Sequence, residues 1–188
     1  PDSFVGVPVT GVSRWWNLHD RKVDLLVYGD THTVEREIRE KSTGSGFTFS
    51  TPFTYDGMVF TGNQTLVRCA EENKLDGECA SLKICVTRST THHKFLEASF
   101  PPDYFTFVSS FEGRVDILIN GTCNVIAADK SQIRWSKLLH NAIRDGKYIR
   151  GEKTMTKEPL AMVTRNTDRE FSDIVNWVVH ALLFGQEQ

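Results

Sequence analysis

The sequence predicts an α/β protein with two lobes. Apolar extended segments alternate with segments of helical periodicity along the chain, a pattern typical of sheets covered by helices. The same alternation starts again in the second half, so each half has the elements for a sheet of its own. Of the 188 residues, 39% are hydrophobic and 11% aromatic, which is enough to close one large core or two small ones.

Strand, helix and strand follow one another at the start of the chain. Ser13 is expected to cap the helix, and Trp15 and Trp16 to form its apolar side. Three such elements within about thirty residues predict a right-handed parallel crossover. The expected elements of the first half are a strand at 3–9, a helix at 13–22, a buried strand at 22–28, a loop at 42–53, an extended segment at 55–62 and a polar, looped connection at 63–82.

The second half repeats this order of elements. Apolar residues at Ile133, Leu138 and Leu139 have a helical spacing, and the last helix is amphipathic and ends near Gly185. We expect functional residues at the carboxyl ends of the strands. The expected elements are strands at 83–88, 104–111, 123–129 and 159–165, helices at 91–100, 130–145 and 169–186, and a helix or extended turn at 112–122.

The charge composition argues against two classes of partner. With 22 basic and 24 acidic residues the formal net charge is -2, and neither sign dominates a long block. Nucleic acid and anionic membrane surfaces therefore lose their usual electrostatic attraction. The apolar runs are too short or too interrupted to cross about 30 Å of hydrocarbon. We expect a chain that does not span a membrane.

Cysteines and sequons favour an oxidising compartment, either secreted and extracellular or periplasmic. The chain has an even number of cysteines and two N-glycosylation sequons, at Asn63 and Asn120. Sequons also arise by chance, and a bacterial periplasm suits disulfides equally well. No CxxC or HExxH pattern supports a metal site from the cysteines with His92 and His93, so we expect neither metal nor cofactor. The four cysteines are Cys69, Cys79, Cys85 and Cys123.

Five stretches resemble one protein family in wording and order. They are KVDLLVYGDTHTVERE, FTYDGMVFTG, LKICVTRSTTH, GTCNVIAADKS and TKEPLAMVTRNTDREFSDIVNWVVHAL. They resemble the periplasmic amino-acid-binding proteins of ABC importers, which have the type 2 solute-binding fold, and in particular the general L-amino-acid-binding branch. The resemblance covers residues 4–187.

This resemblance implies a two-lobed clamp, joined by a hinge, that closes around one free amino acid without catalysis, for transport or sensing. The first lobe would contain residues 1–61 and 158–188, and the second lobe residues 62–157. Strands near 58–62 and 154–160 would connect them. Closure of the clamp would shift an equilibrium between open and closed forms.

The resemblance places ligand contacts from the first lobe after the strand expected at 22–28, which matches the third strand of the family's first lobe. Arg36 stands where the family has the arginine that binds the ligand α-carboxylate, and a guanidinium suits this role because it can donate two parallel hydrogen bonds. Thr31 and Thr33 stand at positions that contact the same ligand. The alternative is that Arg36 begins a charged surface helix and pairs with Glu40, four residues on.

The contacts from the second lobe would follow two of its strands. Ser89, Thr90 and Thr91 open a helix, where free backbone N–H groups and hydroxyls favour an anion. Asp129 matches the aspartate that pairs with the ligand α-ammonium. The alternatives are ordinary helix capping by Ser89 or Thr90 and a turn or cap role for Asp129.

The sequence departs from the family at the proposed site. Asp30 brings a negative charge close to the expected carboxylate position, and His32 stands where an aromatic residue is usual. The loop that commonly reads QTGTTTE is TRSTTHH at residues 87–93, which adds Arg88 and two histidines and loses a glycine. These changes indicate either an altered specificity or a pocket that has lost its ligand.

Family members begin with a further strand and helix, ahead of the segment SFVGV. Without that strand the first lobe would be incomplete, and two neighbouring strands would carry unpaired backbone groups. The resemblance therefore implies a piece of a longer protein, or completion by another subunit in a homo-oligomer or filament. It also implies a disulfide between Cys85 and Cys123, with Cys69 and Cys79 closing a small loop.

Two other classes of function remain as alternatives. The sequons, paired cysteines and altered site would suit a secreted glycoprotein that uses the fold as a coat or filament subunit, with strand donation between chains. An enzyme is the weakest alternative, because the sequence offers no nucleophile with an ordered base and no carboxylate pair with a suitable spacing.

Overall fold

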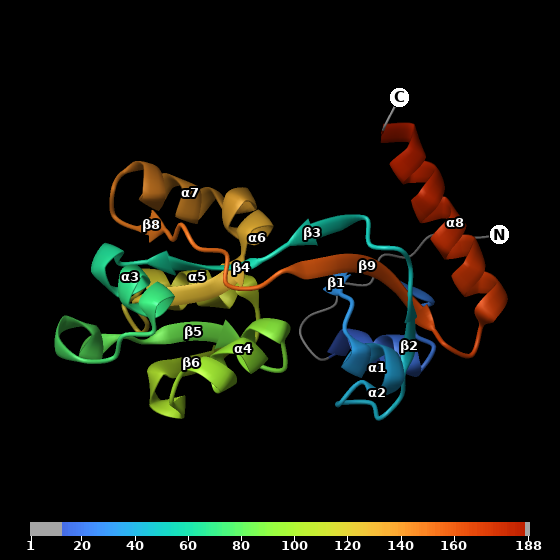
Figure 1. Ribbon diagram of the computed structural model, residues 1–188, viewed down its shortest axis with the longest axis horizontal. Coiled ribbons are helices and arrows are strands. Elements are labelled where there is room, and N and C mark those ends of the chain that lie inside the picture. Colours follow the sequence, from blue (N-terminus) through green and yellow to red (C-terminus); the bar gives the residue numbers. More distant parts are fainter. Residues whose placement is uncertain (1–12, 187–188) are drawn as a thin grey trace. The chain divides into compact units, whose positions relative to one another are not determined.

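The computed structural model describes residues 13–186, which form two compact units (Figure 1). Unit 1 contains the described residues up to Tyr55 and from Glu158 onward, and unit 2 is Asp56–Lys157. The first boundary between the units thus lies between Tyr55 and Asp56, whereas the sequence analysis places the first lobe boundary after Thr61. The α/β fold class is confirmed, with one mixed sheet in unit 2 and, in unit 1, one sheet in which β1 and β2 run antiparallel to β9.

Unit 2 is built on a five-stranded sheet with the order β6-β5-β7-β4-β8. Strand β5 is parallel to β6 and β7, and β4 is antiparallel to β7 and β8. The strands are β4 (Met58–Gly62), β5 (Ile84–Thr87), β6 (Phe105–Val108), β7 (Val125–Asp129) and β8 (Ile149–Arg150). The helices are α3 (Gln64–Glu72), α4 (Thr91–Ser99), α5 (Phe111–Ile119), α6 (Lys130–Trp135) and α7 (Lys137–Arg144), with 3-10 turns at Gly77–Ser81 and Pro102–Tyr104.

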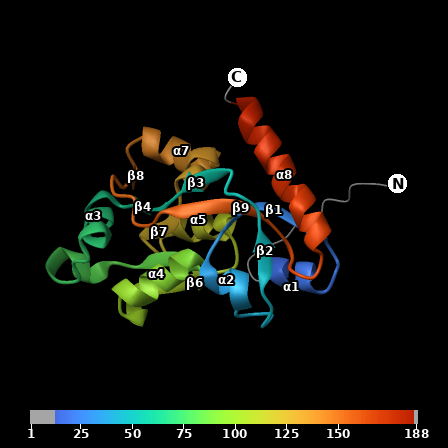
Figure 2. The same ribbon diagram turned by 45° about the vertical axis from the view of Figure 1, so that its right-hand side comes forward.

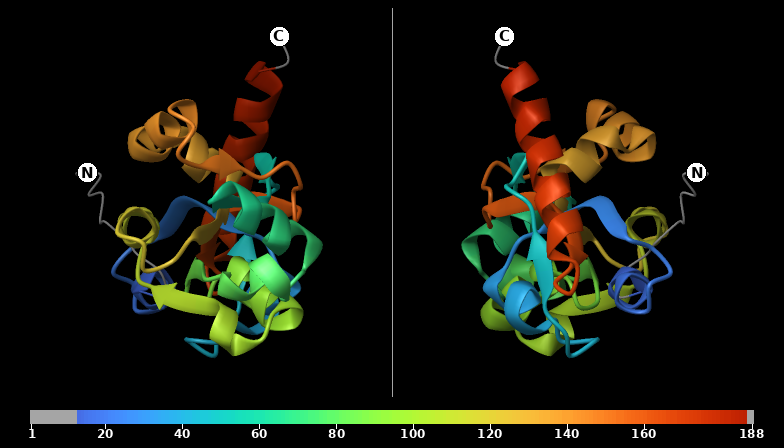
Figure 3. Two further views of the ribbon diagram at one scale, coloured as in Figure 1. Left: turned by 90° about the vertical axis from the view of Figure 1, so that its left-hand side faces the viewer. Right: turned by 90° about the vertical axis from the view of Figure 1, so that its right-hand side faces the viewer.

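Both faces of this sheet are covered by helices, as Figure 1 and the left view of Figure 3 show. Side chains alternate between the faces, so Met58 and Phe60 of β4 pack with α3 and α4, whereas Val59 packs with α5, α6 and α7. The same alternation in β5 places Ile84 on the first face and Cys85 on the second. Strands β4, β5 and β7 are therefore buried on both sides.

Unit 1 has a smaller sheet, in which β9 is the central strand (Figure 2). Strands β1 and β2 pair with it in antiparallel fashion on either side, and β3 also pairs with it. A compact core forms around Trp15, Leu18, Leu26, Phe47 and Val163. The elements are α1 (Ser13–His19), β1 (Leu25–Thr31), α2 (Val34–Arg39), β2 (Phe47–Phe49), β3 (Thr54–Asp56), β9 (Glu158–Arg165) and α8 (Arg169–Gln186).

Helix α8 packs against the sheet of unit 1 through one side only (Figure 3, right). Ser172, Val175 and Val179 are buried, and the Asn176 side-chain oxygen accepts a hydrogen bond from the Thr51 N–H at 2.7 Å. The other side of the helix is also apolar and is left exposed by the described residues. Its exposed large apolar residues are Ile174, Trp177, Val178, Leu182 and Phe184.

Several local expectations need correction. Residues 63–82 form a helix and a 3-10 turn rather than a loop, because Asn63 caps α3 and Leu66, Val67 and Ala70 bury one face of it. The expected helix at 130–145 breaks at Ser136, whose hydroxyl caps α7.

The other corrections concern unit 1, where β2 (Phe47–Phe49) pairs with β9 inside the segment expected as a loop at 42–53. The expected buried strand at 22–28 is only half buried, with Val27 and Tyr28 exposed, and Trp16 is exposed rather than part of the core. The strand expected at 3–9 lies outside the described residues. The parallel crossover that was to connect it to the strand at 22–28 therefore stays a prediction.

Candidate functional site

Arg36 is held in the first turn of α2, directly after β1. Thr33 caps the helix, because its hydroxyl oxygen accepts a hydrogen bond from the Arg36 backbone N–H at 3.3 Å. The side chain is buried, with 8% exposure, and its guanidinium carbon lies 5.0 Å from the centre of the Trp15 ring. Nη1 donates to the Thr31 carbonyl at 2.7 Å. Within residues 13–186 the guanidinium makes no other hydrogen bond, so most of its donors are unused.

The charges around Arg36 come from several elements of unit 1. Burial lowers the pKa of Arg36 below its ordinary value, and the nearby Arg14 lowers it further. The carboxylates of Asp30, Glu158 and Glu40 act in the opposite direction. An arginine keeps its charge in such surroundings, so unit 1 contains a buried cation with spare donors.

The alternative of a surface helix with an Arg36–Glu40 pair is wrong. Arg36 is buried, and the Glu40 carboxylate serves the loop that follows α2. Its Oε2 accepts hydrogen bonds from the backbone N–H groups of Ser42 and Thr43, at 2.9 and 3.0 Å. Glu40 thus orders the loop rather than a helix face.

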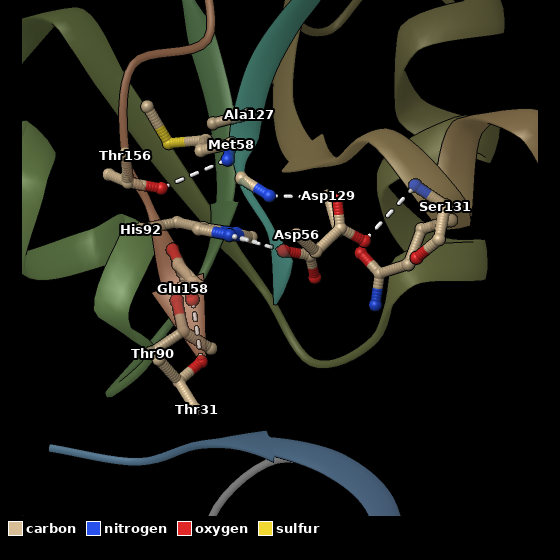
Figure 4. Close-up of polar contacts among 12 residues, drawn as sticks. Thr31, Asp56, Met58, Thr90, His92, Ala127, Asp129, Ser131, Thr156 and Glu158 are labelled. Atoms are coloured by element: carbon tan, nitrogen blue, oxygen red, sulfur yellow. Dashed lines mark hydrogen bonds and ion pairs between the residues drawn. The ribbon is translucent and has the colours of Figure 1, made fainter. Parts of the chain in front are cut away.

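The two threonines predicted as ligand contacts both have partners in unit 1. The Thr31 hydroxyl donates to Glu158 Oε2 at 2.6 Å, a contact drawn in Figure 4. The Thr33 hydroxyl oxygen is used by the helix cap described above. Their direct contact with a ligand stays a prediction.

The two unusual residues before Arg36 are also accommodated within unit 1. Asp30 is buried and its Oδ1 accepts a hydrogen bond from Arg14 Nε at 2.5 Å. His32 stacks on Phe49 with 4.5 Å between the ring centres, and its Nε2 lies 2.9 Å from a carboxylate oxygen of Glu37. His32 therefore stacks on an aromatic ring, as the aromatic residue expected at this position could do.

In unit 2, the TRSTTHH segment forms the turn between β5 and α4. Thr90 caps α4, since its oxygen accepts from the His93 N–H at 3.2 Å while its hydroxyl donates to the Thr87 carbonyl at 2.8 Å. Thr91 is the first residue of the helix. Ser89 has a left-handed backbone with φ of 61°, which is uncommon for residues other than glycine. The predicted capping is confirmed for Thr90, and an anion-binding role of this turn stays a prediction.

Asp129, at the end of β7, has a histidine as its partner. His92 Nε2 lies 3.1 Å from Asp129 Oδ1, as Figure 4 shows. His92 is 4% exposed and comes from the first turn of α4. The structure thus brings the ends of β5 and β7 together within unit 2, joining two regions that the sequence analysis singled out.

A second carboxylate of unit 2 fixes the start of β4 and α6. Asp56 Oδ1 accepts from the Gly57 N–H at 2.7 Å and Oδ2 from the Ser131 N–H at 3.2 Å. The Thr156 hydroxyl oxygen accepts from the Met58 N–H at 2.9 Å (Figure 4). These bonds secure the two chain segments by which unit 2 begins and ends.

Sequence reasoning missed three residues that shape these sites. Arg14 and Glu158 are separated along the chain from the residues they contact, so no local motif could reveal them. His92 was noticed only as a weak metal candidate. Its place in the first turn of the helix that follows the strand at 83–88 was the available signal that it lies near the carboxyl end of that strand.

The two disulfides implied by the resemblance are present. Cys69 pairs with Cys79 and Cys85 with Cys123, with Cα–Cα distances of 5.6 and 5.9 Å. The first joins α3 to the following 3-10 turn, and the second joins β5 to the residues before β7. Between residues 13 and 186, no helix combines the length and apolarity needed to cross a membrane.

Comparison with known proteins gives a consistent set of relatives. No family model matches the chain. The glutamate/glutamine/aspartate/asparagine-binding protein BztA of Rhodobacter capsulatus is 31% identical, over 96% of this chain and 51% of its own length. The general L-amino acid-binding periplasmic protein AapJ of Rhizobium johnstonii is 27% identical, over 100% of this chain and 52% of its own. The chain thus spans about half the length of these relatives.

Solved structures show the same fold at lower sequence identity. A periplasmic binding protein from Brucella ovis with glutathione bound has a TM-score of 0.76 and 22% identity, over 96% of this chain and 55% of that one. The GluR0 ligand-binding core in complex with L-glutamate has a TM-score of 0.74 and 16% identity, over 96% and 76%. The resemblance to amino-acid-binding proteins with the two-lobed type 2 fold is therefore confirmed.

Proposed function

Because its homologues are amino-acid-binding proteins of ABC transporters, we propose that this chain carries the ligand-binding function of such a protein. It would bind a free amino acid without catalysis, for transport or sensing. The names of the relatives support this function, and they give no support to the alternative of a coat or filament subunit.

The observation that carries the proposal is the state of Arg36. A buried guanidinium is costly unless its donors are paired, yet Arg36 uses one donor within the described residues. A ligand carboxylate would pair two further donors through parallel charge-assisted hydrogen bonds. Arg36 would therefore bind the α-carboxylate, which every free amino acid possesses.

Unit 2 contributes groups suited to the same ligand. Asp129 is a strand-end carboxylate that retains 20% exposure of its side chain and would accept the α-ammonium. The turn at Ser89, Thr90 and Thr91 adds hydroxyls and backbone N–H groups at the start of α4. Thr31 and Thr33 of unit 1 would complete the set. We propose that these residues recognise one zwitterion.

We also propose a location outside the cytoplasm, in the periplasm or a secretory compartment. Two disulfides are stable in oxidising compartments and rare in the cytosol. Asn63 and Asn120 are exposed, at the cap of α3 and the end of α5, so both sequons are accessible to glycosylation in a eukaryotic host. Mass measurement before and after glycosidase treatment of native protein tests the glycan.

Thermal unfolding against a panel of free L-amino acids tests the proposed function. An amino acid present at about 100 times its dissociation constant adds about 2.7 kcal/mol to the free energy of unfolding. Stabilisation by a subset of the panel is the expected result and would define the specificity. Absence of any shift, in protein shown by mass spectrometry to carry no bound ligand, would contradict the proposal.

A further inference from the structure

Asp30 is the feature of unit 1 that the proposed function leaves unexplained. It lies on β1 next to Thr31, is 2% exposed, and places a negative charge beside a receptor for a carboxylate. Its Oδ1 is held by Arg14 at 2.5 Å. Its Oδ2 is buried and has no hydrogen-bond partner among residues 13–186. A buried carboxylate oxygen without a donor is costly, so its retention calls for an explanation.

Among the described residues, Arg14 and Arg36 are cations that interact with this carboxylate. Their guanidinium carbons lie 4.8 and 5.0 Å from the centre of the same Trp15 ring. Arg14 binds Asp30 directly, whereas Arg36 interacts with it electrostatically and makes no ion pair with it. Asp30 therefore acts on both arginines but occupies the donors of only one.

Resting on the proposed function, we propose that Asp30 is an internal competitor of the ligand carboxylate for Arg36 and so lowers the affinity of the receptor. Its charge attracts the Arg36 guanidinium as the ligand does, and it repels the incoming carboxylate. Arg14 offsets part of this charge. Asp30 thus lowers the affinity of the site for the amino acid and Arg14 raises it, and neither residue touches the ligand.

The test compares Asp30→Asn, Arg14→Met and the double variant by calorimetric titration with L-glutamine, L-glutamate and L-arginine. Asp30→Asn keeps the shape of the side chain and removes its charge, so binding should tighten about three- to tenfold. Arg14→Met should weaken binding by a similar factor, and the double variant should return towards the wild type. A parallel shift for all three amino acids assigns the effect to their shared α-carboxylate.

Asp24→Asn is the matched control, because Asp24 precedes the same strand and pairs with Arg165 at 2.6 Å while its side chain stays 72% exposed. Its affinity should equal that of the wild type. Both Asp30→Asn and Arg14→Met should unfold at lower denaturant concentration, since each breaks a buried ion pair. Tighter binding by a less stable variant is a result that a merely structural role cannot give.

The outcomes separate this inference from the function on which it rests. If wild type and variants bind none of the amino acids of the full panel, the proposed function fails and the inference fails with it. If the wild type binds and Asp30→Asn binds equally or more weakly, the inference alone is overturned.

Discussion

In unit 2, His92 Nε2 lies 3.1 Å from Asp129 Oδ1, so a buried histidine holds one oxygen of the carboxylate proposed to accept the ligand ammonium. His92 comes from α4 and Asp129 from the end of β7. The bond fixes the orientation of Asp129 and leaves its second oxygen for another donor. In the proposed site, His92 would therefore act by positioning Asp129.

The first prediction concerns Asp129→Asn, which should weaken binding of the preferred amino acid about ten- to a hundredfold. The amide loses the charge that attracts the ammonium, and hydrogen bonds to charged groups contribute about 1.5–3 kcal/mol. Its oxygen can still accept from His92, so the free energy of unfolding should change by less than about 1 kcal/mol. Calorimetric titration and urea unfolding measure the two quantities. Asp116→Asn, on the exposed side of α5, is the control.

The second prediction concerns Arg36 and uses an arginine of the same helix as its control. Arg36→Met keeps much of the side-chain bulk but removes the carboxylate receptor, so binding should weaken at least about a hundredfold. Arg36→Lys should restore only part of the affinity, because an ammonium cannot donate two parallel bonds. Arg39→Met, at an exposed position of α2, should bind as the wild type does. Equal affinities for the Arg36 and Arg39 variants would remove Arg36 from the site.

Much of the fold could be predicted because its signals are local. Strands β4, β5 and β7 are short apolar runs bounded by polar residues, and α8 has a clear helical period. Helix α3 was missed, because charged residues surround its narrow apolar face and its cap at Asn63 was read only as a sequon. In α3, Leu66, Val67 and Ala70 have the spacing of one helix face, but the segment around them is polar enough to suggest a loop.

The candidate site was predictable only in part, because its charges pair across elements. Arg36 was identified through the family resemblance, not through its spacing, which favoured a surface helix. The Arg14–Asp30 pair joins residues 16 positions apart. The His92–Asp129 pair joins residues 37 positions apart. Such contacts depend on the packing of strands and helices, which local patterns in the sequence do not reveal.

The third prediction compares the two disulfides. In the chain-entropy model the stabilisation grows with the length of the closed loop, and the sequence separations are 38 residues for Cys85–Cys123 and 10 for Cys69–Cys79. Replacing Cys85 and Cys123 together by alanine should therefore lower the free energy of unfolding by about 4 kcal/mol, and the other pair by about 3 kcal/mol. Urea unfolding of both double variants measures the difference. A larger loss for the Cys69–Cys79 pair would contradict the loop-length argument.

The fourth prediction concerns Ser89, which has a φ of 61° and stands where the loop QTGTTTE of the family resemblance has glycine. The left-handed backbone costs a side-chain-bearing residue about 1 kcal/mol or more, whereas glycine adopts it freely but loses more entropy on folding. The net effect of Ser89→Gly should be a gain of about 0.5 kcal/mol in the free energy of unfolding. Ser99→Gly, at the end of α4, should instead lower this free energy by about 0.5 kcal/mol, because glycine weakens a helix.

The same variant separates two roles of this turn in binding. If only the backbone N–H groups at the start of α4 meet the ligand, Ser89→Gly should bind amino acids as tightly as the wild type, because the turn keeps its conformation. If the Ser89 hydroxyl donates to the ligand, affinity should fall about three- to tenfold while stability still rises, since one neutral hydrogen bond contributes about 0.5–1.5 kcal/mol. A loss of stability would instead show that the Ser89 side chain supports the turn, and that the strain argument is wrong.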